Sequence, residues 1–215
     1  MATQSRRDIA REVLRRHPTS HAEELHIDVG RNTPAPLFQW LIVSLLFSAR
    51  ISADAAEKGA KALLDQGWTT PEKMAGTSWE ERVRVLNRSG YARYDESTSR
   101  YIGATTDLLL ERYDGDLRRL REEAGHDPEE ERKRLKAFKG IGEVGCDIFF
   151  REAQRAWDEL YPFADEKALD GARRLDLGSD AMELADLVGR DDLPRLLAAL
   201  VRVQLQDEAA AIKDA

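Results

Sequence analysis

A glycine-bounded triplet in the second half of the chain sets the tightest limits on how these 215 residues can fold. Gly140, Ile141 and Gly142 stand between two stretches whose apolar residues recur at helical spacing. Glycine permits turns that a Cβ would block, so Ile141 is expected to tuck between the two helices that the turn joins. Gly145 and Cys146 are small enough to let these helices approach closely. The segment therefore predicts a tight hairpin between two packed helices.

The rest of the sequence is also helical in pattern. Apolar residues recur at helical spacing almost throughout, and there is no strand alternation or β-hairpin turn. Capping boxes at Ser5 and Ser78 and the Asp127–Pro128 pair mark the starts of helices. A polar connector with several prolines covers 18–36, and a loop covers 157–162. The predicted helices before the hairpin cover 5–17, 37–49, 53–65, 71–75, 78–88, 96–113 and 127–138. Two or three more are expected after the loop, so the chain is predicted to be all-α.

Composition excludes several classes of protein. Charged residues make up 34% of the chain, and its longest apolar run, 40–47, is far shorter than the roughly 20 residues of a membrane span. The N-terminus lacks the apolar core and cleavage site of a signal peptide, so a cytoplasmic location is expected. The single cysteine, Cys146, excludes a disulfide framework and any zinc or iron–sulfur site built from several cysteines of this chain. A buried thiol is the expectation.

Charge is distributed unevenly. The net charge is −7, which argues against a general binder of polyanions. Basic residues nevertheless gather before the hairpin, at Arg132, Lys133, Arg134, Lys136 and Lys139. This stretch is either an ordinary solvated helix face or a basic face suited to DNA. Because a tight turn exposes amides at the start of the next helix, the hairpin predicts a site for one DNA phosphate.

Three segments in order give the sequence a likeness to a known family. The string 45–50, Leu-Leu-Phe-Ser-Ala-Arg, ends an apolar helix; the hairpin follows; and Ala164-Asp165-Glu166-Lys167 then leads into an arginine-containing helix at 171–175. This arrangement resembles the helix–hairpin–helix (HhH-GPD) superfamily of DNA glycosylases, in particular endonuclease III, over residues 36–177. The resemblance implies a six-helix barrel at 36–152 that ends in the helix–hairpin–helix. A second lobe would combine 1–35 with 153–215 and carry the catalytic aspartate.

The same resemblance implies a function in base-excision DNA repair. The protein would bind double-stranded DNA as a monomer associated with the nucleoid, flip a damaged or mispaired base and hydrolyse its N-glycosidic bond. Asp165 occupies the catalytic position, where a carboxylate could stabilise positive charge on the sugar. Asp165 also suits the simpler role of a helix N-cap, and both roles can hold at once. Residues expected to contact DNA are Lys139, Gly140, Ile141, Gly142, Val144, Gly145, Arg50 and Tyr91.

Within that set, Arg50 and Tyr91 would fill the space left by the flipped base. Their alternatives are a surface arginine at a helix end and a half-buried loop tyrosine. The resemblance also suggests a monovalent cation at the hairpin carbonyls, and no other cofactor is expected.

Two departures from the family pattern modify this prediction. Bifunctional relatives carry a lysine that forms a Schiff base just after the hairpin, and here Val144 fills that position, so strand cleavage is not expected. Lys167, beside Asp165, is a weak substitute. The four-cysteine iron–sulfur loop of many relatives is absent from this sequence. Two alternatives remain: a DNA-binding or lesion-sensing protein that has lost base excision, and a helical interaction domain that does not touch DNA.

Overall fold

A computed structural model describes residues 5–213. The described residues contain helices and no strand, which confirms the all-α prediction. They divide into two compact units. We call Ile27–Phe149 the hairpin unit, and 5–26 together with 150–213 the terminal unit. This division places 27–35 in the hairpin unit, whereas the sequence predicts boundaries at 36 and 152.

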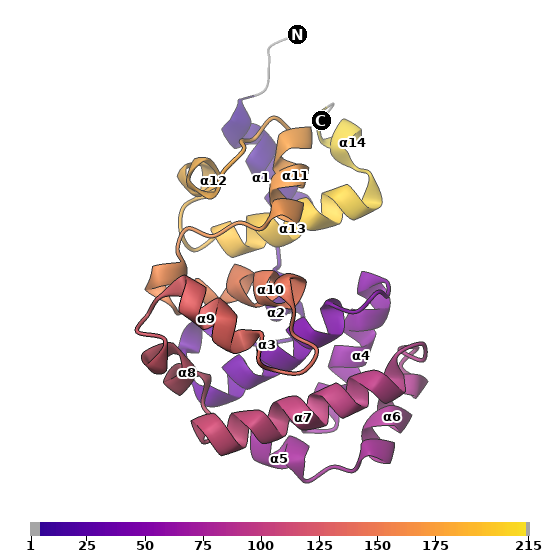
Figure 1. The fold of residues 1–215 in the computed structure, drawn as a ribbon. Coiled ribbons are helices and arrows are strands. Elements are labelled where there is room, and N and C mark those ends of the chain that lie inside the picture. Colours follow the sequence, from indigo (N-terminus) through magenta and orange to yellow (C-terminus); the bar gives the residue numbers. More distant parts are fainter. Residues whose placement is uncertain (1–4, 214–215) are drawn as a thin grey trace. The chain divides into compact units, whose positions relative to one another are not determined.

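The hairpin unit is built around one apolar helix. Helix α3 buries residues on all its sides, which its almost continuous apolar sequence requires, and it crosses the middle of this unit in Figure 1. It packs against α4, α7 and α8. The Trp40 indole N–H donates to the carbonyl of Phe149 at 3.2 Å. The elements of this unit are η1 (Val29–Arg31), α3 (Pro34–Phe47), α4 (Ala53–Asp65), α5 (Pro71–Ala75), α6 (Trp79–Arg88), α7 (Asp95–Tyr113), α8 (Leu117–Glu123), α9 (Pro128–Leu135) and the first part of α10 (Glu143–Ala153).

The terminal unit has its own core around α13. Helix α13 packs against α1, α11 and α12. Gly171 permits the contact with α11, because a Cβ there would lie 2.5 Å from the carbonyl oxygen of Leu200. The elements of this unit are α1 (Arg6–Arg16), α2 (His21–Glu24), η2 (Asp158–Leu160), α11 (Glu166–Arg174), α12 (Ala181–Val188), α13 (Leu193–Gln206), α14 (Ala209–Lys213) and the end of α10.

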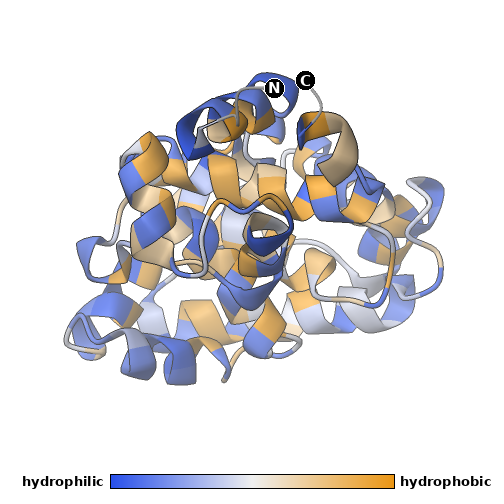
Figure 2. Ribbon diagram, turned by 90° about the horizontal axis from the view of Figure 1, so that it is seen from above, coloured by the Kyte–Doolittle hydropathy of each residue, from blue (hydrophilic) through white to orange (hydrophobic). Residues whose placement is uncertain are grey.

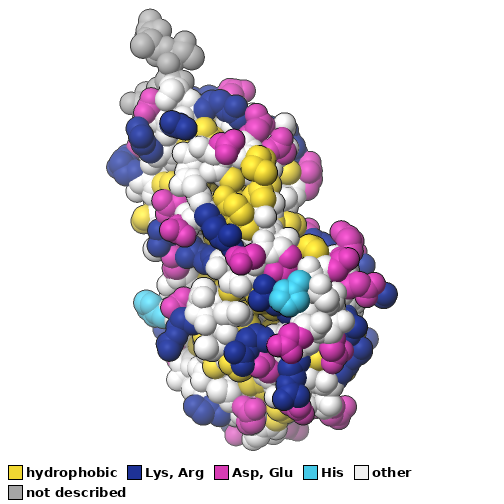
Figure 3. All heavy atoms as spheres, turned by 90° about the vertical axis from the view of Figure 1, so that its left-hand side faces the viewer, with side chains coloured by type: hydrophobic (Ala, Val, Ile, Leu, Met, Phe, Trp, Pro, Cys, Tyr) yellow, Lys and Arg dark blue, Asp and Glu magenta, His cyan; other side chains and the backbone are white. Residues whose placement is uncertain are grey.

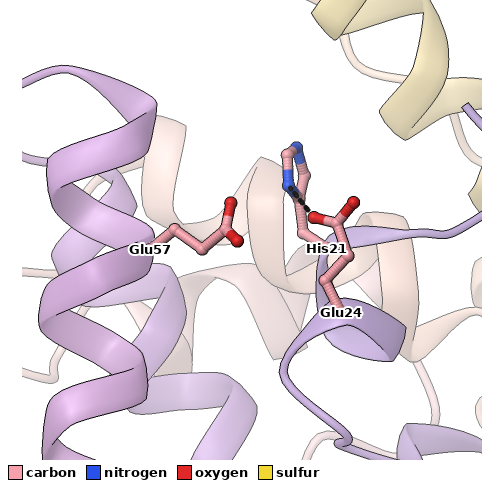
Figure 4. Close-up of side chains that lie close together, drawn as sticks. All are labelled: His21, Glu24 and Glu57. Carbon is pink, nitrogen blue, oxygen red and sulfur yellow. Dashed lines mark ion pairs between the residues drawn. The ribbon is translucent and has the colours of Figure 1, made fainter.

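One polar cluster lies within the terminal unit. Arg202 donates to His21 Nδ1 at 3.0 Å and to Glu24 at 2.5 Å, and the dashed line in Figure 4 marks a 3.8 Å contact between His21 and Glu24 that is an ion pair only when His21 is protonated. Burial lowers the pKa of His21 well below its usual value, and the charges of Arg202 and Arg151 act in the same direction. His21 is therefore held in its neutral form.

Several predicted boundaries need correction. The prediction left 116–126 without a helix, but Asp116 caps α8, and Leu117 and Leu120 are buried. The short helix α2 lies inside the predicted connector and begins with a capping box at Ser20. The helix that starts at Pro128 ends at Leu135 rather than near Phe138, because the chain turns there toward the hairpin. Most helices carry hydrophobic and hydrophilic bands along their length, as expected for helices that each bury one face (Figure 2). Among residues 5–213, no helix is both long and apolar enough to cross a membrane.

Candidate nucleic-acid interface

The turn between α9 and α10 has the predicted form. Gly140 has a φ of +90°, and a Cβ there would lie 2.9 Å from the ring of Tyr101, so only glycine fits. The Ile141 side chain is 4% exposed and packs against Gly145. Cys146, on the same helix, approaches the carbonyl of Arg132 in α9 at 3.7 Å. The prediction of a tight, close-packed hairpin is confirmed.

Gly142 differs from Gly140 in its surroundings. A Cβ at Gly142 would meet nothing within 4 Å, so this glycine leaves open space beside the exposed start of α10. Within the described chain, the amides of Gly142, Glu143 and Val144 donate no hydrogen bond, as is usual for the first turn of a helix. These three amides can therefore bind an anion. The Ile141 amide cannot, because it already donates to the carbonyl of Phe138 at 3.1 Å.

The hairpin is anchored on the helices behind it. The hydroxyl of Thr105, in α7, donates to the carbonyl of Lys139 at 3.0 Å. The hydroxyl of Ser48, at the end of α3, donates to the carbonyl of Gly140 at 3.3 Å. Sequence reasoning missed both anchors, since no local pattern links a hydroxyl to a carbonyl so far along the chain. They hold the turn in one position.

The basic stretch before the hairpin is largely neutralised. Arg132 pairs with Glu143 and Asp147 at 3.1 and 2.8 Å, and Arg134 pairs with Glu123 at 2.7 Å. Lys133 pairs with Glu130, and Lys136 with Glu143. Cationic and anionic side chains also intermingle on the face that Figure 3 shows. This stretch is therefore closer to an ordinary solvated helix face than to a basic DNA-binding face.

Lys139 is the exception in this stretch. Its side chain is exposed, and its ammonium lies 6.0 Å from the centre of the Tyr101 ring. Among residues 5–213 it has no carboxylate partner. The hairpin thus presents one free cation beside three free amides.

Glu143 works against an anion at this site. It is the first residue of α10, and the pKa of its carboxyl group is lowered, chiefly by the hydrogen bond from Lys136; burial opposes this shift, and a hydrogen bond from Arg132 adds to it. Its negative charge occupies the helix end that favours anions and also engages Lys136. Affinity for a phosphate here depends on how far these two cations offset that charge.

The prediction for Tyr91 is wrong. The Tyr91 side chain is 0% exposed, and its hydroxyl donates to the carbonyl of Leu46 at 3.3 Å. The ring packs onto Gly59, where a Cβ would lie 3.1 Å from it. A side chain buried in this way cannot fill a gap in DNA. In the same loop Arg93 is exposed, with its guanidinium 5.3 Å from the centre of the Tyr94 ring.

Two other predicted contact residues also differ from the expectation. Gly145 is buried against Ile141, and Ile141 is itself buried. Neither residue is therefore accessible to a ligand. Arg50 is exposed at the end of α3. Val144 is 58% exposed at the start of α10, and its aliphatic side chain has no nucleophile.

Asp165 lies in the terminal unit as the N-cap of α11. Its Oδ1 accepts the amide of Ala168 at 3.2 Å, which confirms the capping role. Its Oδ2 accepts from Arg151 at 2.9 Å from Nε and 2.8 Å from Nη2. Asp165 is 6% exposed and Arg151 is also buried. The carboxylate is thus fixed at both oxygens and paired with a buried cation.

Sequence reasoning missed Arg151. It lies 14 residues before Asp165, in α10, and the loop at 157–162 separates the two. Lys167, the proposed substitute nucleophile, is exposed on α11. Cys146 is buried, and this burial raises the pKa of its thiol to about 12, so it is an inert core residue.

The fold of this chain is similar to that of solved structures. No protein-family model matches the sequence, and neither does any curated protein. Two solved structures resemble the chain: a trapped endonuclease III–DNA covalent intermediate in an estranged-adenine complex, and a non-covalent endonuclease III–DNA complex. Each has a TM-score of 0.53 and 16% sequence identity to this chain. The first match covers 94% of this chain and the second 93%, and each covers 86% of the endonuclease III chain. The chain therefore has an all-helical fold similar to that of endonuclease III.

Proposed function

We propose that this protein is a DNA glycosylase of base-excision repair that hydrolyses the N-glycosidic bond of a damaged or mispaired base. The observation that carries the proposal is the fixed carboxylate of Asp165, held by the Ala168 amide and by Arg151 on a scaffold like that of endonuclease III. A catalytic group needs such support, because small errors in its placement cost large factors in rate.

The proposed chemistry uses the charge of Asp165. Departure of the base builds positive charge on the deoxyribose, and an aspartate carboxylate stabilises that charge or orients the attacking water. The base must first leave the stack, at a cost of a few kcal/mol. Arg50, which is exposed at the end of α3, is proposed to fill the gap, and Arg93 replaces Tyr91 as the second candidate.

The hairpin is proposed to hold the DNA. The free amides of Gly142, Glu143 and Val144, together with Lys139, would bind one backbone phosphate of double-stranded DNA. A contact of this kind positions the protein without reading sequence. The protein is proposed to act as a monomer on the chromosome, in the cytoplasm.

Strand cleavage is not part of the proposal. The position after the hairpin holds Val144, which cannot form a Schiff base, so the product would be an intact strand with an abasic site.

A monovalent cation at the hairpin carbonyls remains compatible with the contacts there. The carbonyls of Lys139 and Gly140 each accept one hydroxyl, from Thr105 and Ser48. A carbonyl oxygen has two lone pairs, so each could take a second partner. Such an ion would stabilise the turn.

One observation favours a second candidate function, a lesion-sensing DNA-binding protein without base excision. Asp165 is almost fully buried and paired with Arg151, whose charge offsets the one that catalysis would need. In this alternative the pair is a structural N-cap, and only the hairpin contact with DNA is functional.

Base excision separates the two functions. Purified protein is incubated with duplexes that each carry one damaged or mispaired base, and hot alkali then converts abasic sites into strand breaks. We expect breaks with at least one substrate, only after alkali, and none with Asp165→Asn. Glu166→Gln is the matched control, since Glu166 is the next residue and highly exposed, and it should retain activity.

Three outcomes contradict this scheme in different ways. Activity that survives Asp165→Asn would refute the catalytic role of Asp165. Strand breaks without alkali would refute the monofunctional mechanism. Duplex binding without excision of any base in the panel would support the lesion-sensing alternative.

A further inference from the structure

A second candidate contact with DNA lies in the hairpin unit, in a pocket beside the turn. The pocket has a volume of about 370 Å³, within the range of small-ligand sites. Its walls come from the end of α3, the start of α7 and the hairpin. The lining residues that matter here are Arg50, Tyr94, Ser97, Tyr101 and Gly140.

The walls of this pocket are held in place. Tyr101 packs against Gly140, whose positive φ and missing Cβ allow the contact. The Ser48 hydroxyl ties the Gly140 carbonyl to the end of α3 at 3.3 Å. The Ser97 hydroxyl donates to the carbonyl of Tyr94 at 3.1 Å, which fixes the first turn of α7. The pocket is therefore part of the hairpin's support and exists before any ligand binds.

One cation lines the pocket, and two more lie over the rings of its tyrosines. Arg50 lines it, and Lys139 lies over the Tyr101 ring at 6.0 Å. Neither forms an ion pair with a carboxylate of the described chain. Arg93 lies over the Tyr94 ring at 5.3 Å.

The acidic residues at the start of α7 are already engaged. Asp95 accepts from the Asn87 side chain at 2.8 Å and from the Glu96 amide at 2.7 Å. Glu96 pairs with Arg100 at 3.7 Å. Neither Asp95 nor Glu96 lines the pocket, and the one charged side chain among the lining residues is that of Arg50.

Two tyrosine rings with cations at the rim suit one class of ligand, an aromatic base attached to a phosphate. Bases stack on aromatic side chains whatever their sequence, and arginine and lysine bind the phosphate that follows. We propose that this pocket binds one unstacked nucleobase of the strand whose phosphate the hairpin holds. The inference rests on the proposed DNA binding. All lining residues belong to the hairpin unit, so the base is assigned separately from the one that Asp165 would excise.

The test measures the affinity for three duplexes by fluorescence anisotropy. One is fully paired, one carries a single bulged adenine, and one carries an abasic site in place of that adenine. If the base stacks on tyrosine, wild-type protein should bind the bulged adenine about tenfold more tightly than either of the others. Deoxyadenosine monophosphate is then added as a competitor. If the pocket binds a base that belongs to the strand, millimolar nucleotide should leave the preference unchanged. If the pocket binds free nucleotides, the preference should disappear.

Two substitutions at Ser97 form a matched pair. Ser97→Leu fills the pocket and should abolish the tenfold preference without changing affinity for the paired duplex. Ser97→Ala removes the hydroxyl without filling the pocket and should keep the preference. Arg50→Gln, at an exposed position, should reduce the preference and serves as the test if Ser97→Leu fails to fold.

The possible failures can be told apart. Equal affinity of wild-type protein for all three duplexes would overturn the pocket and leave the hairpin contact intact. A preference that persists in Ser97→Leu would also overturn it. No binding to any duplex would overturn both the pocket and the proposed function, whereas a preference without base excision would overturn only the glycosylase proposal.

Discussion

Removing one partner of the Arg151–Asp165 pair should destabilise the protein strongly. In Asp165→Asn the Arg151 guanidinium stays buried without a counter-charge, and breaking a buried pair in this way costs about 3–5 kcal/mol. Asparagine is a good N-cap, so the capping contribution of about 1 kcal/mol is retained, while Asp165→Ala would lose it as well. For a chain of this size the expected fall in Tm is roughly 6–20 °C.

The double variant makes the prediction specific. Arg151→Met should cost about as much as Asp165→Asn, because it leaves a buried carboxylate alone. Arg151→Met with Asp165→Asn removes both charges and should fall within about 1–2 kcal/mol of wild type. Urea unfolding followed by circular dichroism measures all four proteins. Single variants within about 0.5 kcal/mol of wild type, or costs that simply add in the double variant, would refute the reasoning.

This result also bears on the activity assay. If Asp165→Asn is destabilised as expected, its loss of base excision must be measured at a temperature where it remains folded. The double variant then serves as a second inactive protein whose folding is close to normal.

Three further predictions concern binding, pH and packing. Glu143→Gln frees Lys136 at the hairpin, so in a salt titration it should tighten duplex binding and steepen the salt dependence by about one phosphate contact. The control is Glu130→Gln, which frees Lys133 away from the turn and should change neither quantity. Equal effects of the two substitutions would contradict this prediction. Folding lowers the pKa of His21, so the unfolded chain binds the proton more readily than the folded one. The free energy of unfolding should therefore be unaffected by this group above pH 6.5 and should fall below that pH by up to about 1.4 kcal/mol per pH unit. Thermal melts at pH 7.5 and 5.5 should show a smaller fall in His21→Gln than in wild type, and an equal fall would contradict the assignment. Gly171→Ala places a Cβ 2.5 Å from a backbone oxygen of α13 and should lower Tm by several degrees in a thermal melt; an unchanged Tm would show that the two helices separate without cost.

The parts of the fold that depend on local sequence could be predicted. Gly140 and Ile141 specify the turn through backbone freedom and one apolar side chain, both of which are readable from the sequence. The capping box at Ser78 was readable for the same reason. Short helices such as α8 could not be predicted, because their few buried residues give too brief a periodic pattern.

The parts of the site that depend on tertiary packing could not be predicted. The sequence predicts that Tyr91 contacts DNA, but its ring packs on Gly59, a residue 32 positions earlier. Most cations of the basic stretch before the hairpin form ion pairs, among them pairs with acidic residues on α8 and α10. Sequence spacing holds no information about such pairings, since they depend on how the helices pack.

The proposed contact between the hairpin and DNA is tested most directly by reversing the charge of Lys139, which has no carboxylate partner among residues 5–213. Anisotropy titrations between 50 and 200 mM salt would compare wild type with Lys139→Glu, and with Lys73→Glu on α5 as a control of equal charge change. Lys139→Glu should weaken binding to every duplex and reduce the salt slope by about 1, while Lys73→Glu should leave both nearly unchanged. Unaltered affinity in Lys139→Glu would mean that DNA does not bind at the hairpin.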